Sequence, residues 1–441
     1  FCQDAFLNQL GVSPTFNLLT SVMDDMRPEN KYLHLMDEQE AITKAQALLN
    51  RQGEVAVSPL AVYRHASKAD SVQQGRPNVV LIMMESMSSK LMKHFGQSET
   101  LTPFLDSLYT RSISFRNFYS AGIHTNHGLY ATLYSFPAMM KRNLMKGSVI
   151  PRYSGLPTVL KENGYYNLFF MTHEGQYDNM NAFFRTNGYD EVFSQEDYPA
   201  DKVVNSFGVQ DDFLYDYAIP VLNQRAATGE PFFATLLSIS NHPPYVIPPF
   251  FHPKTSEPET QIVEYADWAL RKFFEEARKQ PWFDNTIFVL EGDHGKLVGD
   301  AECELPESYN HIPLMIYSSR IHPEERNTFG GQVDIQPTIL GLLNIDYLQN
   351  NFGVDLLKEE RPCMFYTADN MIVGRNDTLL YLYNYETQQE FTYHIDNGKL
   401  KAVPMDDLFL PLKEYSFSML QSAEFLVKHG KTVNSVPFTQ Q

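Results

Sequence analysis

Short, mostly apolar runs recur along this chain, and they constrain its fold more than any other feature. The runs occupy residues 78–84, 166–172, 232–240, 286–291 and 313–318. A strand buried on both faces reads as such a run, as central parallel strands do. Helical patterns alternate with the runs, at residues 102–111, 156–164, 261–280 and 333–345. This alternation predicts an α/β fold with a doubly wound, mostly parallel central sheet flanked by helices.

A helical lead-in precedes this alternation. Within residues 1–77, helical patterns cover residues 13–25 and 37–52. The polar stretch "SKADSVQQGRP", residues 67–77, is typical of a loop and marks a boundary. We therefore expect a helical linker over residues 1–77, followed by the α/β domain over residues 78–360.

The end of the chain has a different pattern. Residues 371–396 read as short antiparallel strands separated by Asn-Asp and Asp-Asn-Gly turns. Residues 413–430 form a helical pattern that closes the chain. We expect residues 361–441 to form a small C-terminal antiparallel β region with one helix.

Composition excludes some classes of partner and site. The chain has 441 residues and a formal net charge of −18. Long-range repulsion by such an acidic protein opposes non-specific binding to nucleic acid or to an anionic membrane face, so we expect no nucleic-acid partner. The three cysteines, Cys2, Cys303 and Cys363, form no CxxC pair, which argues against a cysteine zinc site. At most one disulfide can form among them.

The chain contains no apolar segment long enough for a transmembrane helix, and no signal peptide. It begins at Phe1 rather than at a methionine. We therefore expect a fragment of a longer protein, anchored to a membrane through a segment upstream of this chain.

Metal-competent side chains follow two of the predicted strands. The run "MMES" places Glu85 just past the first strand, and "EGDHG" places Asp293 and His294 just past another. Ligands of open α/β sheets collect beyond the carboxyl ends of the strands, so neighbouring strands would bring these residues into one crevice. A mixed oxygen and nitrogen set suits manganese, zinc or magnesium. The alternative is that each residue is only a helix cap or a turn residue.

A third segment supplies a candidate nucleophile. In "SAGIHTNHGLYATLYSFP", residues 120–137, Thr125 starts a helical pattern that runs to Ser135. A hydroxyl at a helix N-terminus faces unpaired N–H groups and the positive end of the helix dipole. A metal bound to the same oxygen would lower its pKa and make it a nucleophile. The alternative is that Thr125 is an ordinary N-cap.

Six segments occur in an order that resembles one family. They are "NVVLIMMES", "TPFLDSLYTRSISFRNFYSAGIHTNHG", "SNHPPY", "YADWALRKFF", "NTIFVLEGDHGK" and "YNHIPLMIY". Together they resemble the extracellular catalytic domain of the lipoteichoic acid synthase family, within the sulfatase and alkaline phosphatase superfamily. The similarity runs from residue 78 to about residue 357. It implies an alkaline phosphatase-like fold and a catalytic role for the α/β domain.

The resemblance implies a role for each residue of the candidate site. Glu85, Asp293 and His294 would bind one divalent metal ion, with Mn²⁺ favoured over Zn²⁺ or Mg²⁺. Thr125 would complete the metal site and attack phosphorus. His242 and His173 match substrate-site positions of the family.

Two further histidines are candidate substrate ligands. His311 precedes a predicted strand and would lie at the rim of the crevice. His124 stands just before the candidate nucleophile, where the Gram-positive synthases carry a lysine. A phosphoryl transfer needs an acid for the leaving group, and histidine suits that role at neutral pH.

The chain departs from the family at the head-group site. The family holds glycerol phosphate with a tryptophan and an arginine, and "YDNMNAFFR" has neither at the matching spacing. Arg185 is a candidate substitute. No C/S-x-P-x-R motif of the sulfatases that mature a formylglycine occurs, which argues against sulfate ester hydrolysis.

These observations predict a metal-dependent phosphotransferase that acts outside the cytoplasm. It would move glycerol phosphate, or a related head group, from a phospholipid such as phosphatidylglycerol to a cell-envelope glycan or lipid, through a phosphothreonine. Alternatives from the same superfamily are a phosphoethanolamine transferase, a phosphodiesterase that uses water and a sulfatase-like hydrolase. An alternative from another class is a binding module that kept the fold and lost the chemistry.

Overall fold

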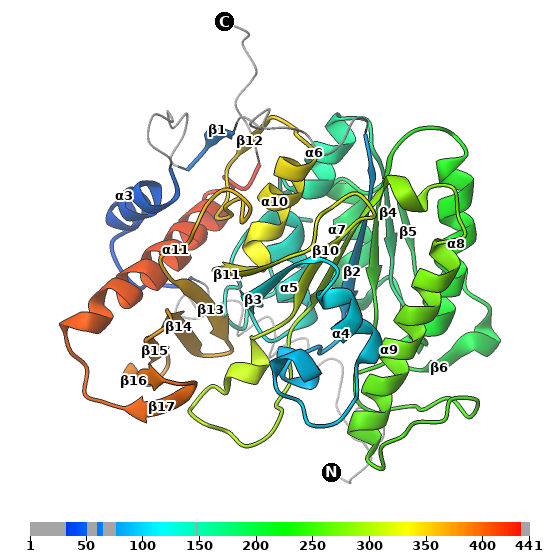
Figure 1. The fold of residues 1–441 in the computed structure, drawn as a ribbon. Coiled ribbons are helices and arrows are strands. Elements are labelled where there is room, and N and C mark those ends of the chain that lie inside the picture. Colours follow the sequence, from blue (N-terminus) through cyan, green and yellow to red (C-terminus); the bar gives the residue numbers. More distant parts are fainter. Residues whose placement is uncertain (1–31, 51–59, 65–75, 147–148, 434–441) are drawn as a thin grey trace, which may run out of the picture.

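An eight-stranded sheet runs through the centre of the molecule (Figure 1). The computed structural model describes residues 32–50, 60–64, 76–146 and 149–433. In sheet order, the strands are β11 (Glu324–Gly331), β3 (Ile113–Tyr119), β10 (Leu314–Tyr317), β9 (Thr286–Gly292), β2 (Asn78–Met84), β8 (Phe232–Leu237), β4 (Tyr166–Phe170) and β5 (Glu191–Phe193). Neighbouring strands are parallel except at β10, which is antiparallel to both β3 and β9. The predicted, mostly parallel sheet is confirmed.

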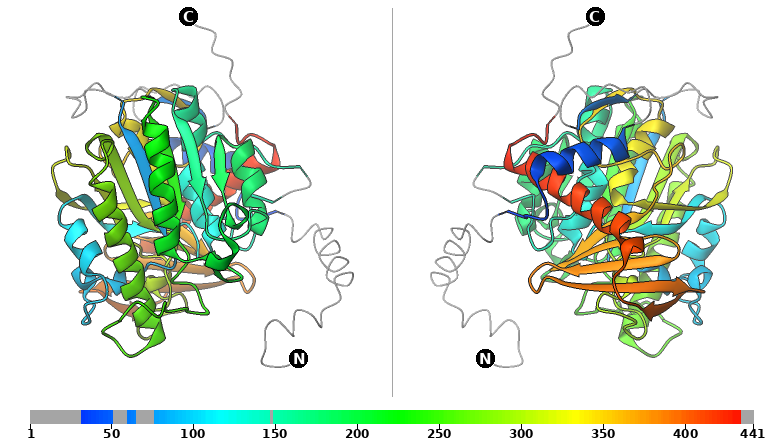
Figure 2. Two further views of the ribbon diagram at one scale, coloured as in Figure 1. Left: turned by 90° about the vertical axis from the view of Figure 1, so that its right-hand side faces the viewer. Right: turned by 90° about the vertical axis from the view of Figure 1, so that its left-hand side faces the viewer.

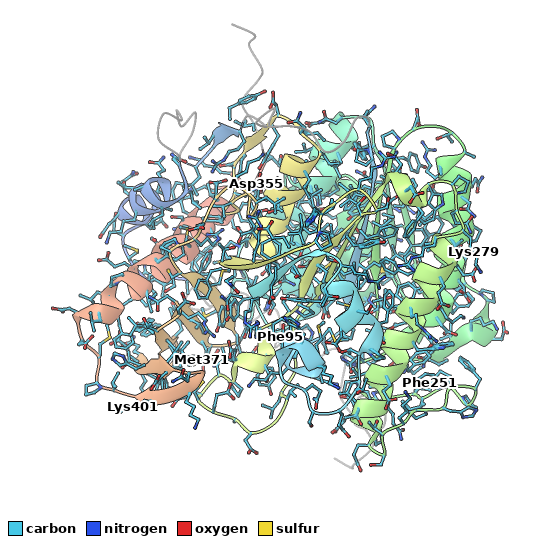
Figure 3. All side chains as sticks on the ribbon, viewed as in Figure 1. Phe95, Phe251, Lys279, Asp355, Met371 and Lys401 are labelled. Atoms are coloured by element: carbon cyan, nitrogen blue, oxygen red, sulfur yellow. The ribbon has the colours of Figure 1, made fainter. Side chains whose placement is uncertain are left out.

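Strand β2 shows why the sequence has continuous apolar runs. All seven of its residues are buried, because helices cover both faces of the sheet (Figures 1 and 2). Val80 and Ile82 pack with the first layer, which is α4 (Pro103–Tyr109), α8 (Asp211–Ala226) and α9 (Pro258–Ala277). Val79 and Leu81 pack with the second, which is α5 (Thr125–Tyr134), α6 (Leu156–Glu162), α7 (Met180–Thr186) and α10 (Ile335–Leu342). Side chains fill the space between the sheet and both layers (Figure 3).

The C-terminal region forms a second sheet beside the first (Figure 1). Its five strands are antiparallel and in chain order: β13 (Met364–Ala368), β14 (Met371–Arg375), β15 (Leu379–Asn384), β16 (Gln389–Asp396) and β17 (Lys399–Ala402). Helix α11 (Leu410–Lys428) packs against β13 and β14. The predicted small antiparallel sheet with a closing helix is confirmed, with one more strand at each end than the sequence pattern indicated.

The N-terminal region packs on the C-terminal helix. Helix α3 (Glu38–Leu49) begins at Asp37, whose carboxylate accepts hydrogen bonds from two backbone N–H groups of the first turn. The N–H of Leu33 donates to the Glu424 carboxylate of α11 at 3.0 Å. Strand β1 (Val62–Arg64) pairs with β12 (Tyr347–Gln349). These contacts hold the lead-in on the body of the protein.

Several predictions about the lead-in and the domains remain untested. The predicted helix at residues 13–25 lies outside the described residues, as does most of the predicted loop at 67–77. Residues from all three predicted segments share one hydrophobic core, among them Ala45, Leu81 and Leu420. The division into residues 1–77, 78–360 and 361–441 therefore stays a prediction.

Some elements differ from the sequence prediction. Strand β11 was not predicted, because it is an edge strand whose first half is exposed and polar. Helix α10 is shorter than predicted, since the residues directly before it, Gln332–Asp334, form a 3-10 turn. A small hairpin, β6 (Val203–Asn205) with β7 (Gly208–Val209), adds to the predicted elements.

The structure also bears on the cysteines and on membrane-spanning segments. Cys303 and Cys363 are free thiols, and Cys2 lies outside the described residues. Among the described residues, no helix has both the length and the apolar character needed to cross a bilayer.

Candidate metal and nucleophile site

Two neighbouring parallel strands bring the predicted metal ligands together. In the register of β2 and β9, Met84 lies opposite Gly292, so both strands end at the same edge of the sheet. Glu85 and Asp293 are the next residues of each strand. One ligand atom from each of Glu85, Asp293 and His294 lies within 4.8 Å of the others. The sheet therefore assembles the mixed carboxylate and imidazole set at its carboxyl edge.

Backbone contacts fix the two carboxylates in place. The N–H of Ser86 donates to Asp293 Oδ1 at 2.8 Å, which ties the end of one strand to the other. The N–H of Glu85 donates to the Ser238 hydroxyl at 2.9 Å. Ser86 has a φ of 50°, in the left-handed region that non-glycine residues seldom occupy. Such backbone strain is typical of functional sites.

The hydroxyl of Thr125 points at these carboxylates. Thr125 is the first residue of α5, and His124 occupies the N-cap position. Thr125 Oγ1 donates to Asp293 Oδ2 at 2.8 Å and lies 3.4 Å from Glu85 Oε2. The hydroxyl is therefore not an N-cap, and the helix N-terminus and the carboxylates meet at this one oxygen.

Close packing of α5 on β9 makes this approach possible. A Cβ on Gly128 would lie 2.3 Å from the carbonyl oxygen of Asp293, so a larger residue would push the helix away. The Gln332 amide donates to the same carbonyl at 2.7 Å and accepts from the N–H of Ala121 at 2.9 Å. Gln332 thus joins the strand end to the segment before Thr125. The sequence carried no local signal for this role.

Burial makes the negative charges of the two carboxylates unfavourable. Glu85 and Asp293 are 1% and 0% exposed. Burial and the nearby Asp293 raise the pKa of Glu85 well above its usual value. In the described part of the chain, the basic group within ion-pair distance of either carboxylate is His294, at 3.7 Å and 3.6 Å. Buried carboxylates are normally paired with a cation or bound to a metal, so this pair calls for a cation.

His294 is oriented as a metal ligand would be. Its Nδ1 lies 2.8 Å from the carbonyl oxygen of Gly295, which can only accept, so Nδ1 carries the proton. Nε2, the other ring nitrogen, then faces the two carboxylates. Metal-binding histidines commonly donate their other ring N–H to a backbone carbonyl in this way. The donor set of two carboxylates, an imidazole and a hydroxyl fits one divalent ion.

His242 lies at the edge of the cluster, and the substrate role of the buried His173 stays a prediction. His242 Nδ1 donates to the Pro243 carbonyl at 2.6 Å, and its ring centre is 4.1 Å from that of Phe207. His173 is buried, with its ring centre 4.7 Å from that of Tyr177. Burial lowers the pKa of both histidines. His242 follows Asn241, whose amide donates to the Glu85 carbonyl at 3.1 Å, so it lies beside the end of β2.

The remaining predicted substrate histidines behave differently. His124 is exposed, and its Nε2 lies 3.0 Å from Asp369 in the turn between β13 and β14. The second sheet thereby touches the start of the nucleophile helix. His311 donates to the Arg116 carbonyl at 2.8 Å and stacks on Tyr119, so its contacts belong to the protein interior. These contacts do not link His311 to the cluster, and its substrate role stays a prediction.

Arg185 does not take the place of the missing head-group arginine. Its guanidinium donates to the side chain of Asn181 and to the carbonyl of Val192. These bonds hold α7 to β5 and occupy donors of the guanidinium. The suggested substitution is therefore not supported by the side-chain position.

Two residues that contact the cluster escaped the sequence analysis. Asn241 is buried, and its amide donates to the carbonyls of Glu85 and Ser86, both at 3.1 Å. Its oxygen accepts a hydrogen bond from Lys296 Nζ at 2.6 Å. Burial lowers the pKa of Lys296 to about 8. Lys296 follows His294 by two residues in the motif "EGDHGK", which was the available signal.

Comparison with known proteins agrees with this geometry. The sulfatase family matches residues 77–345. Lipoteichoic acid synthase 1 of Bacillus subtilis is 25% identical over 354 residues, which cover 74% of this chain and 54% of that protein. Lipoteichoic acid synthase of Staphylococcus aureus is 24% identical over 327 residues, which cover 64% of this chain and 48% of that protein. The chain thus spans about half the length of these curated relatives.

Solved structures share the fold. A protein of the alkaline phosphatase superfamily from Vibrio parahaemolyticus superposes with a TM-score of 0.80 at 25% identity, covering 92% of this chain and 99% of that one. The lipoteichoic acid synthase LtaP from Listeria monocytogenes superposes with a TM-score of 0.71 at 21% identity, covering 88% and 98%. The chain therefore belongs to the sulfatase family, in the alkaline phosphatase superfamily, and resembles its lipoteichoic acid synthases.

Proposed function

We propose that this protein is a metal-dependent phosphotransferase that works outside the cytoplasm. It takes glycerol phosphate, or a similar head group, from a phospholipid such as phosphatidylglycerol. It passes that group to a glycan or lipid of the cell envelope through a phosphothreonine at Thr125. The observation that carries the proposal is the hydrogen bond of Thr125 Oγ1 to Asp293 Oδ2, at 2.8 Å.

The chain's own residues account for the main steps. Thr125 Oγ forms a bond to phosphorus as the bond from phosphorus to the lipid alcohol breaks. Asp293 holds the hydroxyl in position and is the nearest acceptor for its proton. The N–H groups at the start of α5 stabilise the negative phosphoryl oxygens. His242, one residue after the Asn241 that bonds the Glu85 carbonyl, is the candidate that gives the leaving alcohol its proton. An acceptor alcohol then attacks the phosphothreonine and gives its proton to His242, while Thr125 leaves and takes its proton back from Asp293.

One divalent ion fits among these residues. Glu85, Asp293, His294 and Thr125 would hold it, and Mn²⁺ is the proposed ion, with Zn²⁺ and Mg²⁺ as alternatives. A bound ion would neutralise charge on the phosphoryl group and lower the pKa of the Thr125 hydroxyl.

The relatives support the class of reaction. Curated relatives are named lipoteichoic acid synthases, at about a quarter sequence identity and over half their length. By analogy with them, we propose that a segment outside this chain anchors the protein to the membrane.

A second candidate is phosphoethanolamine transfer. The observation behind it is that the head-group segment lacks the family's tryptophan and arginine, while Arg185 bonds to Asn181 and Val192, which weakens the case for a glycerol head group. A transferase of this kind would use the same Thr125 and the same metal set with a different lipid. Comparing two lipid donors separates the two candidates.

Intact mass spectrometry tests the mechanism. The protein is incubated with Mn²⁺ and either phosphatidylglycerol or phosphatidylethanolamine, in wild-type, Thr125→Ala and Thr110→Ala forms. We expect one head-group phosphoryl adduct on wild type and on the control Thr110→Ala, which loses an exposed hydroxyl. Thr125→Ala should form none. Full lipid turnover by Thr125→Ala would overturn the mechanism, and turnover without an acceptor would identify a phosphodiesterase.

A further inference from the structure

Lys296 is a half-buried cation beside the candidate metal site. It lies two residues after His294, and its Nζ is 5.1 Å from the centre of the Tyr245 ring. Its hydrogen-bond partner is the neutral Asn241 amide. Among the described residues, no carboxylate lies within 4.0 Å of this ammonium group. Glu259 and Glu85 attract this partly desolvated charge, but only from beyond ion-pair distance.

Asn241 holds this ammonium group in a defined place. The Asn241 side chain is 2% exposed and donates to the carbonyls of Glu85 and Ser86. Because all of its bonds are to the strand end and to Lys296, it ties the lysine to the backbone of a metal ligand. An ammonium group has three donors, and Asn241 accepts from one of them. Lys296 therefore has donor capacity left beside the cluster.

Another cation near this part of the fold is already neutralised. Lys146 pairs at 2.7 Å with Asp178, whose carboxylate also accepts from Asn126 of α5. Lys296 differs in that no described carboxylate forms an ion pair with it, although Glu259 and Glu85 attract it from further away. Burying a cation without a counter-ion is unfavourable, so the counter-ion is expected to arrive with a ligand. Beside a hydroxyl poised for phosphoryl transfer, that ligand is an anionic phosphate ester.

We propose that Lys296 is a positioning residue that donates a hydrogen bond to a non-bridging oxygen of the phosphoryl group bound at Thr125. It supplies the positive charge that the head-group segment lacks. The proposal rests on the proposed function, because it assumes that a phosphate ester occupies this site. It predicts that the site selects anionic phosphate esters over neutral alcohols of the same shape.

Calorimetric titration with sn-glycerol 3-phosphate tests the role of Lys296. The Mn²⁺-loaded protein is compared in wild-type, Lys296→Met, Lys296→Gln and Lys296→Arg forms. Loss of a charged hydrogen bond should weaken binding by roughly 10- to 100-fold in the Met and Gln variants. The Arg variant should recover part of the affinity, and free glycerol should not bind to any form. Lys161→Met, which removes an exposed lysine paired with Asp190, is the matched control.

Three further measurements separate this proposal from others. Mn²⁺ binding without phosphate should be the same in wild type and Lys296→Met, which excludes damage to the metal site. In lipid turnover, the Met variant should raise KM more than it lowers kcat. The titration is repeated in Thr125→Ala, which cannot form the adduct. A Lys296-dependent affinity there supports the proposal even if the transfer reaction fails. Affinities of the Met and Gln variants within twofold of wild type would overturn it.

Discussion

Buried carboxylates occur in two regions of the molecule. In one region they pair with arginines, and in the other they have no arginine partner among the described residues. At the seam between the central sheet and the C-terminal region, Arg361 Nε donates to the Asp334 carboxylate at 2.9 Å, and both side chains are buried. Arg375 bonds the Glu307 carboxylate in the same region. At the carboxyl edge of the sheet, Glu85 and Asp293 have no such arginine among the described residues.

The pKa directions record this difference. Although burial opposes it, Arg375 lowers the pKa of Glu307 to about 2. Burial and Asp293 raise the pKa of Glu85. The same chain can thus supply a buried arginine where a carboxylate is structural. Leaving two carboxylates without one is costly for stability, and such a cost is typical of a binding or catalytic site.

The largest expected effect comes from neutralising the carboxyl edge. Asp293→Asn keeps an oxygen that can accept from the Ser86 N–H, and it loses the negative charge. We expect Mn²⁺ binding to disappear and phosphoryl transfer to fall by more than about 10³-fold, because metal and nucleophile both depend on this carboxylate. Calorimetry and a lipid turnover assay measure these changes.

The same variant tests the cost of the unpaired charges. In the presence of a chelator, Asp293→Asn should unfold at the same temperature as wild type or higher, since the repulsion with Glu85 is gone. A chelated variant that unfolds well below wild type would show that Asp293 is mainly structural.

The seam should respond in the opposite way. Arg361→Met leaves the Asp334 carboxylate buried without its cation and removes hydrogen bonds to Tyr415 and Phe352. We expect a loss of about 3–5 kcal/mol in the free energy of unfolding. Chemical denaturation measures it. Adding Asp334→Asn to Arg361→Met should restore part of the loss, and no recovery would mean that the charge is not its cause.

Added Mn²⁺ should stabilise variants of the two regions differently, and this effect should be smaller than the loss in Arg361→Met. An ion that binds only the folded protein, supplied at 100 times its Kd, adds about 2.7 kcal/mol of stability. The melting temperature of wild type should therefore rise by a few degrees with Mn²⁺. Arg361→Met should show the same rise from a lower starting point, because its metal site is intact. Asp293→Asn should show none, and an equal rise in that variant would place the ion elsewhere.

The sequence could predict an element where the element's own residues carry a clear pattern. Strand β2 was predicted with its observed bounds, because burial on both faces leaves a continuous apolar run. The meeting of Glu85 and Asp293 followed once both strand ends were placed at one edge of the sheet. The edge strand β11 has no such run, and the antiparallel direction of β10 leaves no mark in its composition.

Contacts over long sequence separations could not be predicted. Gln332 joins segments that lie 39 and 211 residues away, and Asn241 reaches Glu85 across 156 residues. Histidines show the same limit. His242 and His311 both stand beside strands in the sequence. His242 follows Asn241, which bonds the Glu85 carbonyl, whereas His311 bonds the Arg116 carbonyl and stacks on Tyr119. The side-chain environment that separates them is set by the tertiary fold.

Acid should weaken the seam through Glu307, with the smallest effect. The folded pKa of about 2 lies below the usual value of about 4.3 for a glutamate in an unfolded chain. The carboxylate therefore adds stability above the higher value, and this contribution is lost as the pH falls through the lower one. Glu307→Gln lacks it at every pH, so its deficit in melting temperature should be largest near neutrality and should shrink below about pH 4. Glu276→Gln loses an exposed pair with Lys279 and should follow wild type throughout. A deficit for Glu307→Gln that stays constant from pH 6 to pH 3 would mean that hydrogen bonding, and not the ion pair with Arg375, accounts for the role of Glu307 at the seam.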